Sequence, residues 1–355
     1  MKRTAAGLLA GLIVLATGCQ EADTEYHHRS TEEDGGISDI TEDVPEQDKT
    51  EHSETTEGSS DEKPEDVIEL SPDWDPFSTT AVSAETDPTE GYLAIPQDNV
   101  PDWSALQEVN PDTRGWITVP GTNIDSVVVQ GEDNEYYYHH DFYGNDNEGG
   151  SIFADFKCDF RSDEMPDNTI LYGSGKLYRY AFSALSSYVK DIDFLKKTPM
   201  VDFRTQYKKN KYKIISVFIT NIQEEHGEVF DYTNYAYFRN SDEFYSYILE
   251  VMDRSMYNTG VDVQYGDELL TLSTDDASAG IDDMRLVIVA RKVREGEQPE
   301  VDTSNITRKD SVKYCEAYTE AYGSKWKGRT WDISLVQGMK EYLEENGLMD
   351  EPENY

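Results

Sequence analysis

Three cysteines are the residues of this chain best suited to nucleophilic chemistry. Cys19 follows an apolar N-terminal run, whereas Cys158 and Cys315 lie in the body of the sequence. Cys158 could act as a nucleophile only beside a base or a positive charge, and Lys157 alone gives little support for that. Cys158 and Cys315 could instead form a disulfide, or each could remain a buried free thiol, the commoner outcome for an isolated cysteine.

A second group with chemical potential is the acidic loop 275–283. Its four carboxylates belong to Asp275, Asp276, Asp282 and Asp283. Such hard oxygen ligands could bind calcium, although their spacing is not that of an EF-hand. The simpler interpretation is a solvated acidic loop that pairs in part with Arg285. The sequence contains no Cys-x-x-Cys or His-x-x-x-His pattern, so we expect no other metal or cofactor.

The N-terminus has the features of an export signal. Lys2 and Arg3 precede an apolar run over residues 5–16, which is too short to span a bilayer. The run ends in Leu15-Ala16-Thr17-Gly18-Cys19, which resembles a bacterial lipobox. We therefore expect residues 1–18 to be a signal peptide. Diacylation of Cys19 would anchor the protein to the outer face of the cell membrane, as in Gram-positive bacteria. The alternative is an ordinary signal peptide with an incidental cysteine.

Residues 19–92 are predicted to be a disordered acidic tether. Within residues 21–90, 24 acidic residues stand against three basic ones, and Ser, Thr, Gly and Pro make up most of the rest. Such a segment buries too little apolar surface to offset the entropy lost on ordering. Repulsion between like charges keeps it extended, which suits a link between a membrane anchor and a folded domain.

The rest of the chain is acidic as well. The whole sequence has a formal net charge of −41 at pH 7, of which residues 91–355 carry −22. This charge argues against a nucleic-acid partner, because phosphate contacts need basic patches. It also argues against docking on anionic lipid headgroups, whereas a basic or neutral partner is easier to accommodate.

Residues 93–298 have the pattern of a mainly β domain. Short runs rich in β-branched and aromatic residues are separated by Gly, Pro, Asn and Asp. The predicted strands are 116–119, 124–130, 150–154, 169–172, 200–203, 212–220, 267–273 and 285–291. The predicted helices are 103–109, capped by Asp102, and two more around 182–189 and 242–256. Strands and helices do not alternate regularly, so we expect a closed β-barrel of about eight strands with peripheral helices.

Residues 299–355 are predicted to form a C-terminal helical extension. One helix is expected over 310–322, where tyrosines recur at i, i+4 spacing, and another over 332–346. The second carries an apolar stripe of Ile333, Val336, Met339 and Leu343. Such a stripe usually packs on its own domain, but it could also form a surface for a partner.

A series of short motifs spans residues 95–295. They are Asn110 to Ile117, Pro120 to Asp125, Val128 to Gly131, Asp133 to Tyr137, His140 to Phe142, Gly150 to Phe153, Thr169 to Gly173, Leu270 to Thr274 and Arg285 to Ala290. In this order they resemble the class B sortases. By that resemblance, Thr169 to Gly173 is the strand leading to the catalytic histidine, and Leu270 to Thr274 is the strand ending on the catalytic cysteine. Arg285 is the family's essential arginine.

The resemblance implies a sortase-like barrel with a defined chemistry. In a sortase, cysteine attacks the peptide bond after Thr in a sorting signal, histidine protonates the leaving amine, and arginine stabilises the developing oxyanion. In this sequence the histidine position is Ser174 and the cysteine position is Asp275, and only Arg285 is kept. Serine has no proton to give near neutral pH, and a carboxylate is a poor nucleophile toward an amide. We therefore expect a catalytically inactive protein, a pseudo-sortase.

The same resemblance predicts geometry. Ser174, Asp275 and Arg285 should meet at one end of the barrel, and the Asp275 carboxylate should pair with the Arg285 guanidinium. The alternative is that Asp275 points to water and Arg285 packs elsewhere.

Three functions are compatible with these expectations. The first is a non-catalytic module whose groove recognises a sorting-signal-like peptide, a cell-wall component or another surface protein. The second is an active sortase-family cysteine transpeptidase or hydrolase that uses non-standard residues. The third is a structural lipoprotein whose barrel only scaffolds the C-terminal helices.

Overall fold

The computed structural model describes residues 102–176, 181–276 and 280–349. The predicted signal peptide, Cys19 and the whole of the acidic segment that follows lie outside these ranges. Within them, the structure contains no helix with the length and hydrophobicity needed to cross a membrane.

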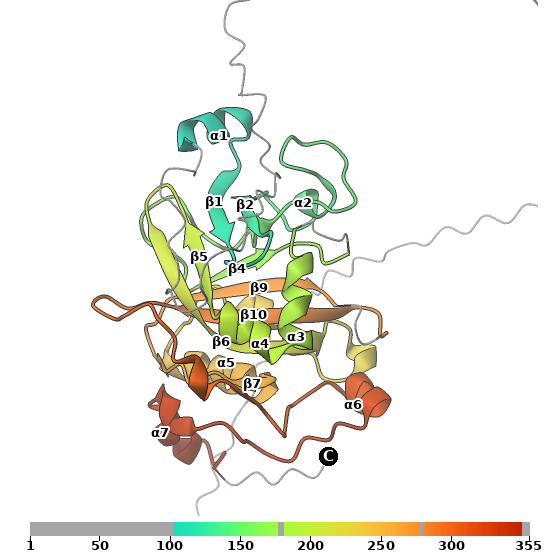
Figure 1. Cartoon of the computed structure of the whole chain (residues 1–355), viewed down its shortest axis with the longest axis vertical. Helices are drawn as coiled ribbons and strands as arrows, with labels where there is room; N and C mark the ends of the chain where they lie inside the picture. Colours follow the sequence, from blue (N-terminus) through green and yellow to red (C-terminus); the bar gives the residue numbers. More distant parts are fainter. Residues whose placement is uncertain (1–101, 177–180, 277–279, 350–355) are drawn as a thin grey trace, which may run out of the picture. The chain divides into compact units, whose positions relative to one another are not determined.

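Eight strands close into a barrel in the order β1-β2-β3-β4-β9-β10-β6-β5 (Figure 1). Their bounds are β1 Thr113–Thr118, β2 Asp125–Val129, β3 Phe153–Ala154, β4 Asn168–Tyr172, β5 Met200–Arg204, β6 Lys209–Asn221, β9 Leu269–Asp275 and β10 Met284–Lys292. The β2–β3 and β4–β9 pairs are parallel and the others are antiparallel. These are the eight strands predicted from the sequence, so the closed barrel is confirmed.

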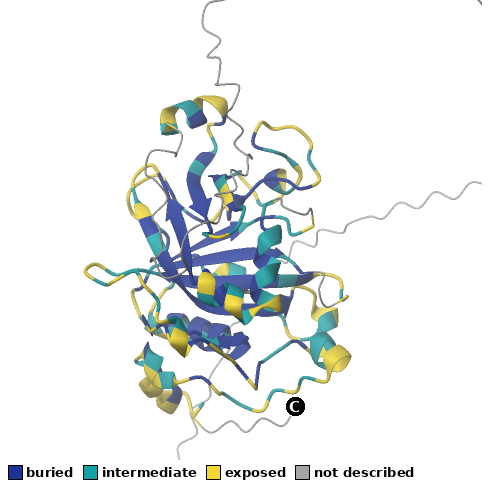
Figure 2. Ribbon diagram, viewed as in Figure 1, coloured by how far each residue is buried: buried dark blue, intermediate teal, exposed yellow. Residues whose placement is uncertain are grey.

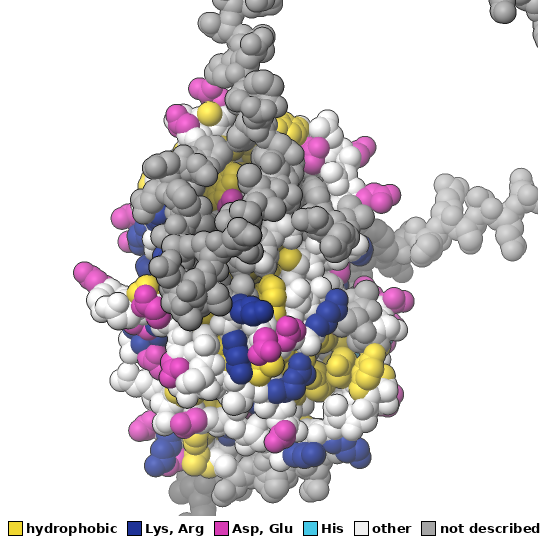
Figure 3. Space-filling model, viewed as in Figure 1, with side chains coloured by type: hydrophobic (Ala, Val, Ile, Leu, Met, Phe, Trp, Pro, Cys, Tyr) yellow, Lys and Arg dark blue, Asp and Glu magenta, His cyan; other side chains and the backbone are white. Residues whose placement is uncertain are grey.

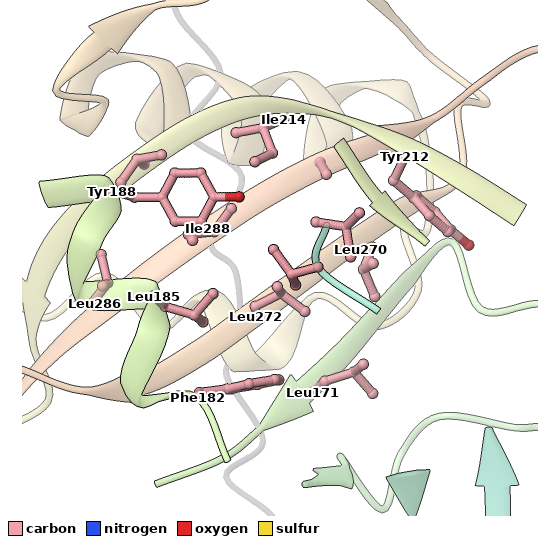
Figure 4. Packing of buried hydrophobic residues seen from close by; sticks show 14 of the residues in the cluster. Leu171, Phe182, Leu185, Tyr188, Tyr212, Ile214, Leu270, Leu272, Leu286 and Ile288 are labelled. Carbon is pink, nitrogen blue, oxygen red and sulfur yellow. The ribbon is translucent and has the colours of Figure 1, made fainter. Parts of the chain in front are cut away.

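Apolar side chains fill the interior of the barrel, because alternate residues of each strand point inward. Figure 4 shows Leu171 of β4, Leu270 and Leu272 of β9, and Leu286 and Ile288 of β10 packed together. Each of these side chains is at most 1% exposed. This packing fixes β4, β9 and β10 against one another, and these are the strands that carry the predicted site.

Helices surround the barrel. They are α1 Trp103–Val109, α2 Tyr136–His139, α3 Ser187–Lys190, α4 Ile192–Lys197, α5 Ser241–Arg254, α6 Glu316–Tyr322 and α7 Met339–Glu345. The start of α1 is as predicted, since the Asp102 side chain accepts a hydrogen bond from the Ser104 N–H. At the start of α5, the Asn240 side chain accepts one from the Glu243 N–H in the same way. The helix predicted over 182–189 is instead a 3-10 turn, Ser183–Ser186, followed by α3.

Two predictions about the C-terminal extension are wrong in detail. Of the helix predicted over 310–322, only α6 is helical. The helix predicted over 332–346 is interrupted: β12, Val336–Gln337, pairs with β8, Val263–Gln264, before α7 begins. Gly338 causes the break, because its φ of 88° is a left-handed conformation that ends a regular helix. A second short pair joins β11, Thr307–Arg308, to β7, Tyr257–Asn258.

The extension covers the outer side of α5. Trp331, Val336, Met339 and Leu343 are buried in one cluster with side chains of α5 and the barrel. Figure 1 shows the extension on the side of α5 away from the barrel, and Figure 2 shows α5 largely buried between them. The apolar stripe therefore packs on its own domain.

Candidate active site of the barrel

The three predicted site positions lie at one end of neighbouring strands. Tyr172 of β4 is in register with Ser273 of β9, and Ser174 and Asp275 each follow two residues later. Arg285 of β10 is paired directly with Asp275. β4 and β9 stay close beyond their last paired residues, because a Cβ on Gly175 would lie 2.7 Å from the Asp275 backbone oxygen. The convergence predicted from the sequence is therefore confirmed.

An ion pair joins the strands at this end of the barrel. Arg285 Nη1 lies 3.1 Å from Asp275 Oδ1, and the two side chains are 20% and 15% exposed. The same Nη1 donates a hydrogen bond to the Met284 carbonyl. Arginine presents a fork of N–H donors that suits a carboxylate, and partial burial strengthens the attraction. The predicted pairing is present, and the alternative in which Asp275 points to water is excluded.

Ser174 lacks the partner that would activate a hydroxyl. Its Oγ accepts a hydrogen bond from the backbone N–H of Lys176, and its carbonyl accepts one from Phe182. No histidine of the described residues hydrogen-bonds to this hydroxyl. A nucleophilic serine needs a neighbouring base to take its proton. Ser174 thus has the surroundings of a turn residue rather than a nucleophile.

Lys176 is a site residue that the sequence reasoning missed. Its Nζ lies 3.4 Å from the Tyr138 hydroxyl and 5.7 Å from the centre of that ring. The hydrogen bond with Tyr138 raises the pKa of Lys176, and the field of Asp275 adds to this shift. The ammonium therefore stays protonated at neutral pH and cannot serve as a base for Ser174. In the sequence, only its position two residues after Ser174 could have indicated that Lys176 lies near the site.

Tyr232 lies against β9 near its site end. Its hydroxyl lies 2.7 Å from Ser273 Oγ, and its side chain is buried. Burial raises the pKa of Tyr232, so the phenol stays neutral. Tyr232 therefore offers a fixed hydroxyl next to the Asp275–Arg285 pair and no acid or base near neutral pH.

Comparison with known proteins identifies the family. No family model matches the chain. The chain is 31% identical over 189 residues to sortase B of Listeria monocytogenes, which covers 53% of the chain and 72% of the relative. It is 28% identical over 194 residues to sortase B of Staphylococcus aureus, with 55% and 75% covered. The chain belongs to the class B sortase family. Among solved structures, Clostridium perfringens sortase B is 30% identical, with 54% of this chain and all of that chain covered and a TM-score of 0.48.

The described residues include two thiols, Cys158 and Cys315, and both are free and buried. Cys158 is a free, buried thiol whose Sγ accepts a hydrogen bond from the Ile170 N–H, before β4 reaches its site end. Burial raises its pKa to about 12, so the reactive thiolate is scarce at neutral pH.

Cys315 is also free and buried, at the N-cap of α6. The disulfide considered from the sequence is therefore absent. Both side chains belong to the core cluster of the barrel, where Cys158 lies against β4 and Cys315 at the start of α6.

The acidic loop is described only in part, because residues 277–279 lie outside the described ranges. In the described residues, no three His, Cys, Asp or Glu side chains gather as a metal site would require. Asp275 is held by Arg285, as the solvated-loop interpretation expected. On the face drawn in Figure 3, the described Lys and Arg side chains are interspersed with Asp and Glu instead of gathered in one patch.

Proposed function

We propose that this protein is a non-catalytic class B sortase that recognises a sorting-signal-like peptide or a cell-wall component. The observation that carries the proposal is the ion pair between Asp275 and Arg285. An arginine that already binds the protein's own carboxylate is not free to stabilise an oxyanion on a substrate. The residue that pairs with it stands where the family has its nucleophile, so one substitution removes two catalytic functions.

The surrounding residues support inactivity as well. Ser174 occupies the position of the general acid, and the described hydrogen bond of its hydroxyl is to the backbone N–H of Lys176, whose own side chain is held as a cation. Cys158 is buried away from this end of β4. A sortase or hydrolase that uses non-standard residues would need at least one activated nucleophile, and none of these three side chains meets that requirement.

The place of action is part of the proposal. We infer that Cys19 is diacylated and that the acidic segment after it tethers the barrel outside the cell membrane. Retention of the barrel and of Arg285 favours a recognition role. The hypothesis that the barrel only scaffolds the C-terminal helices has less support. The C-terminal extension packs into the same core as α5, so it is not an independent domain that the barrel presents.

A binding assay tests the proposal. The mature protein, with Cys19→Ser for solubility, is titrated into a fluorescent peptide that carries a sorting signal, and anisotropy and peptide integrity are followed together. We expect saturable binding with the peptide left intact. Arg285→Gln should weaken binding, whereas Arg161→Gln, an exposed arginine paired with Asp159, should not. Absence of saturable binding to sorting-signal and cell-wall peptides would overturn the recognition role.

A further inference from the structure

Lys176 gives the site a second cation. Its ammonium faces the Tyr138 ring and hydroxyl, which carry no formal charge. Among the described residues, no carboxylate lies within ion-pair distance of Lys176, whereas the Arg285 guanidinium is paired with Asp275. Lys176 is therefore a cation without an ion-pair partner among the described residues, next to a paired Asp275 and Arg285, in a domain whose net charge is strongly negative.

The backbone holds Lys176 close to that ion pair. Gly175, the preceding residue, lies so near β9 that a Cβ there would be 2.7 Å from the Asp275 oxygen and 2.8 Å from Thr274 Oγ1. The charges act on one another, because both Asp275 and Arg285 influence the pKa of Lys176. The backbone thus holds the Lys176 side chain beside the ion pair.

We propose that Lys176, held beside the Asp275–Arg285 pair, forms a subsite for a carboxylate, so that the preferred ligand is a peptide with a free C-terminal carboxylate. This inference rests on the recognition role proposed above and specifies the form of the ligand. A carboxylate brings a full negative charge that the unpaired Lys176 ammonium attracts, and charge-assisted hydrogen bonds are stronger than neutral ones. The carbonyl of an uncleaved peptide bond is neutral and cannot compete with Asp275 for the guanidinium.

The ligand implied is a cleaved peptide and not the intact chain that an active sortase would process. Its C-terminal residue would carry the carboxylate that hydrolysis after Thr generates. Asp275 need not leave, since the ammonium of Lys176 remains available beside it. The site would then distinguish a finished cleavage product from an uncleaved precursor.

A matched pair of peptides tests this inference. A fluorescent tetrapeptide ending in Thr is prepared with a free C-terminal carboxylate and as its C-terminal amide, and both are titrated with the mature Cys19→Ser protein. We expect the carboxylate form to bind about fivefold more tightly, with an advantage that shrinks as salt is added. Lys176→Gln should remove the preference. Lys190→Gln, which alters an exposed lysine of α3, should keep it.

The outcomes separate this inference from the proposed function. Equal affinity for the two peptides would overturn the carboxylate subsite and leave peptide recognition standing. A preference that Lys176→Gln does not change would also overturn it, because the discriminating charge would lie elsewhere. No binding of either form would overturn both proposals. Matching melting temperatures of the two glutamine variants would show that each is folded.

Discussion

Arg285 and Asp275 form a partly buried ion pair that links β10 to β9. A guanidinium that is 20% exposed needs a nearby acceptor, and Asp275 supplies a carboxylate 3.1 Å away. Because the pair is held in antiparallel register between β9 and β10, neither partner can leave without exposing the other. Removing one member of a partly buried pair leaves an uncompensated charge, which is unfavourable. Loss of either partner alone should therefore destabilise this end of the barrel, and in the proposed function the same pair would occupy the position of a substrate oxyanion.

The burial of Cys158 and Cys315 predicts that both thiols react slowly in the folded protein. In a Cys19→Ser protein, Cys158 and Cys315 are the remaining cysteines. Both are buried, and burial raises the pKa of each thiol, so neither should react with Ellman's reagent at pH 7.4 over minutes. Two thiols per chain should react at once in guanidinium chloride. Rapid reaction of one thiol in the native protein would contradict the burial described here, and no reaction after unfolding would indicate a disulfide.

Helix α5 connects the barrel to the C-terminal extension, because side chains of both pack against it. An amphipathic helix usually buries one stripe, but α5 buries residues on two sides because the extension covers its outer face. Asp253 near its end is a buried carboxylate that accepts a hydrogen bond from Trp331 Nε1 at 2.6 Å. The extension is therefore attached through a polar contact as well as through apolar packing.

Trp331→Ala tests this attachment. The substitution removes a buried ring and leaves Asp253 without its indole donor, so we expect the free energy of unfolding to fall by about 3–5 kcal/mol. Urea denaturation followed by circular dichroism measures the loss. Trp326→Ala, at a partly exposed position of the same extension, serves as the control. Equal small losses for both variants would mean that the extension contributes little to the folded core.

Lys309 provides a test by pH. Its Nζ donates hydrogen bonds to the carbonyls of Met252 and Asp253 at the end of α5, and burial lowers its pKa to about 8 from 10.5. Between these values the unfolded chain binds the proton more than the folded chain does, so folding becomes more favourable as pH rises. Asp253 opposes the shift and Arg329 adds to it.

We expect the wild type to gain stability relative to Lys309→Met as pH is raised from 7.5 to 10, a range set by the lowered and ordinary pKa values. Urea denaturation at several pH values measures the difference between the two proteins, which cancels the titration of other groups. Lys190→Met, at an exposed position of α3, should show no such trend. A difference in stability that stays constant with pH would mean that folding does not lower the pKa of Lys309.

The barrel was predictable from the sequence because its strands have strong local signals. Most of the eight barrel strands are rich in β-branched or aromatic residues, and the order of the motifs that resemble class B sortases placed Ser174, Asp275 and Arg285 together. The extension was harder to predict. From its spacing, Val336 belongs to the apolar stripe of a helix, but in the structure it lies in β12, which pairs with the distant strand β8. Lys176 was missed for a related reason: its proximity to Asp275 depends on the register of β4 with β9, which local patterns do not encode.

At the scale of the whole molecule, the proposal combines a membrane anchor, an acidic segment and a recognition domain. In this proposal, repulsion between the like charges of residues 21–90 would extend the tether and carry the barrel into the space beyond the membrane. The same negative charge makes non-specific adhesion to anionic lipids unfavourable. Recognition would then depend on local features such as Lys176 and Arg285 and not on the net charge.

The lipid anchor is tested at the mature N-terminus. We expect mass spectrometry of the protein from its native membrane to find a diacylglycerol-modified Cys19, because two acyl chains are enough for stable attachment. Cys19→Ser should move the protein from the membrane fraction to the soluble fraction. Cys315→Ser, which alters a buried thiol of the extension, should leave it in the membrane. An unmodified N-terminus at another residue would contradict the anchor.

A turnover measurement tests catalytic inactivity most directly. The purified mature protein is incubated with a sorting-signal peptide and an amine acceptor, and the peptide and the intact protein are followed by mass spectrometry. The Asp275–Arg285 pair predicts no cleavage above the peptide blank and no acyl adduct on the protein. Time-dependent cleavage that is lost in Ser174→Ala or in Cys158→Ala would contradict the account, because it would show that this barrel has kept a working nucleophile.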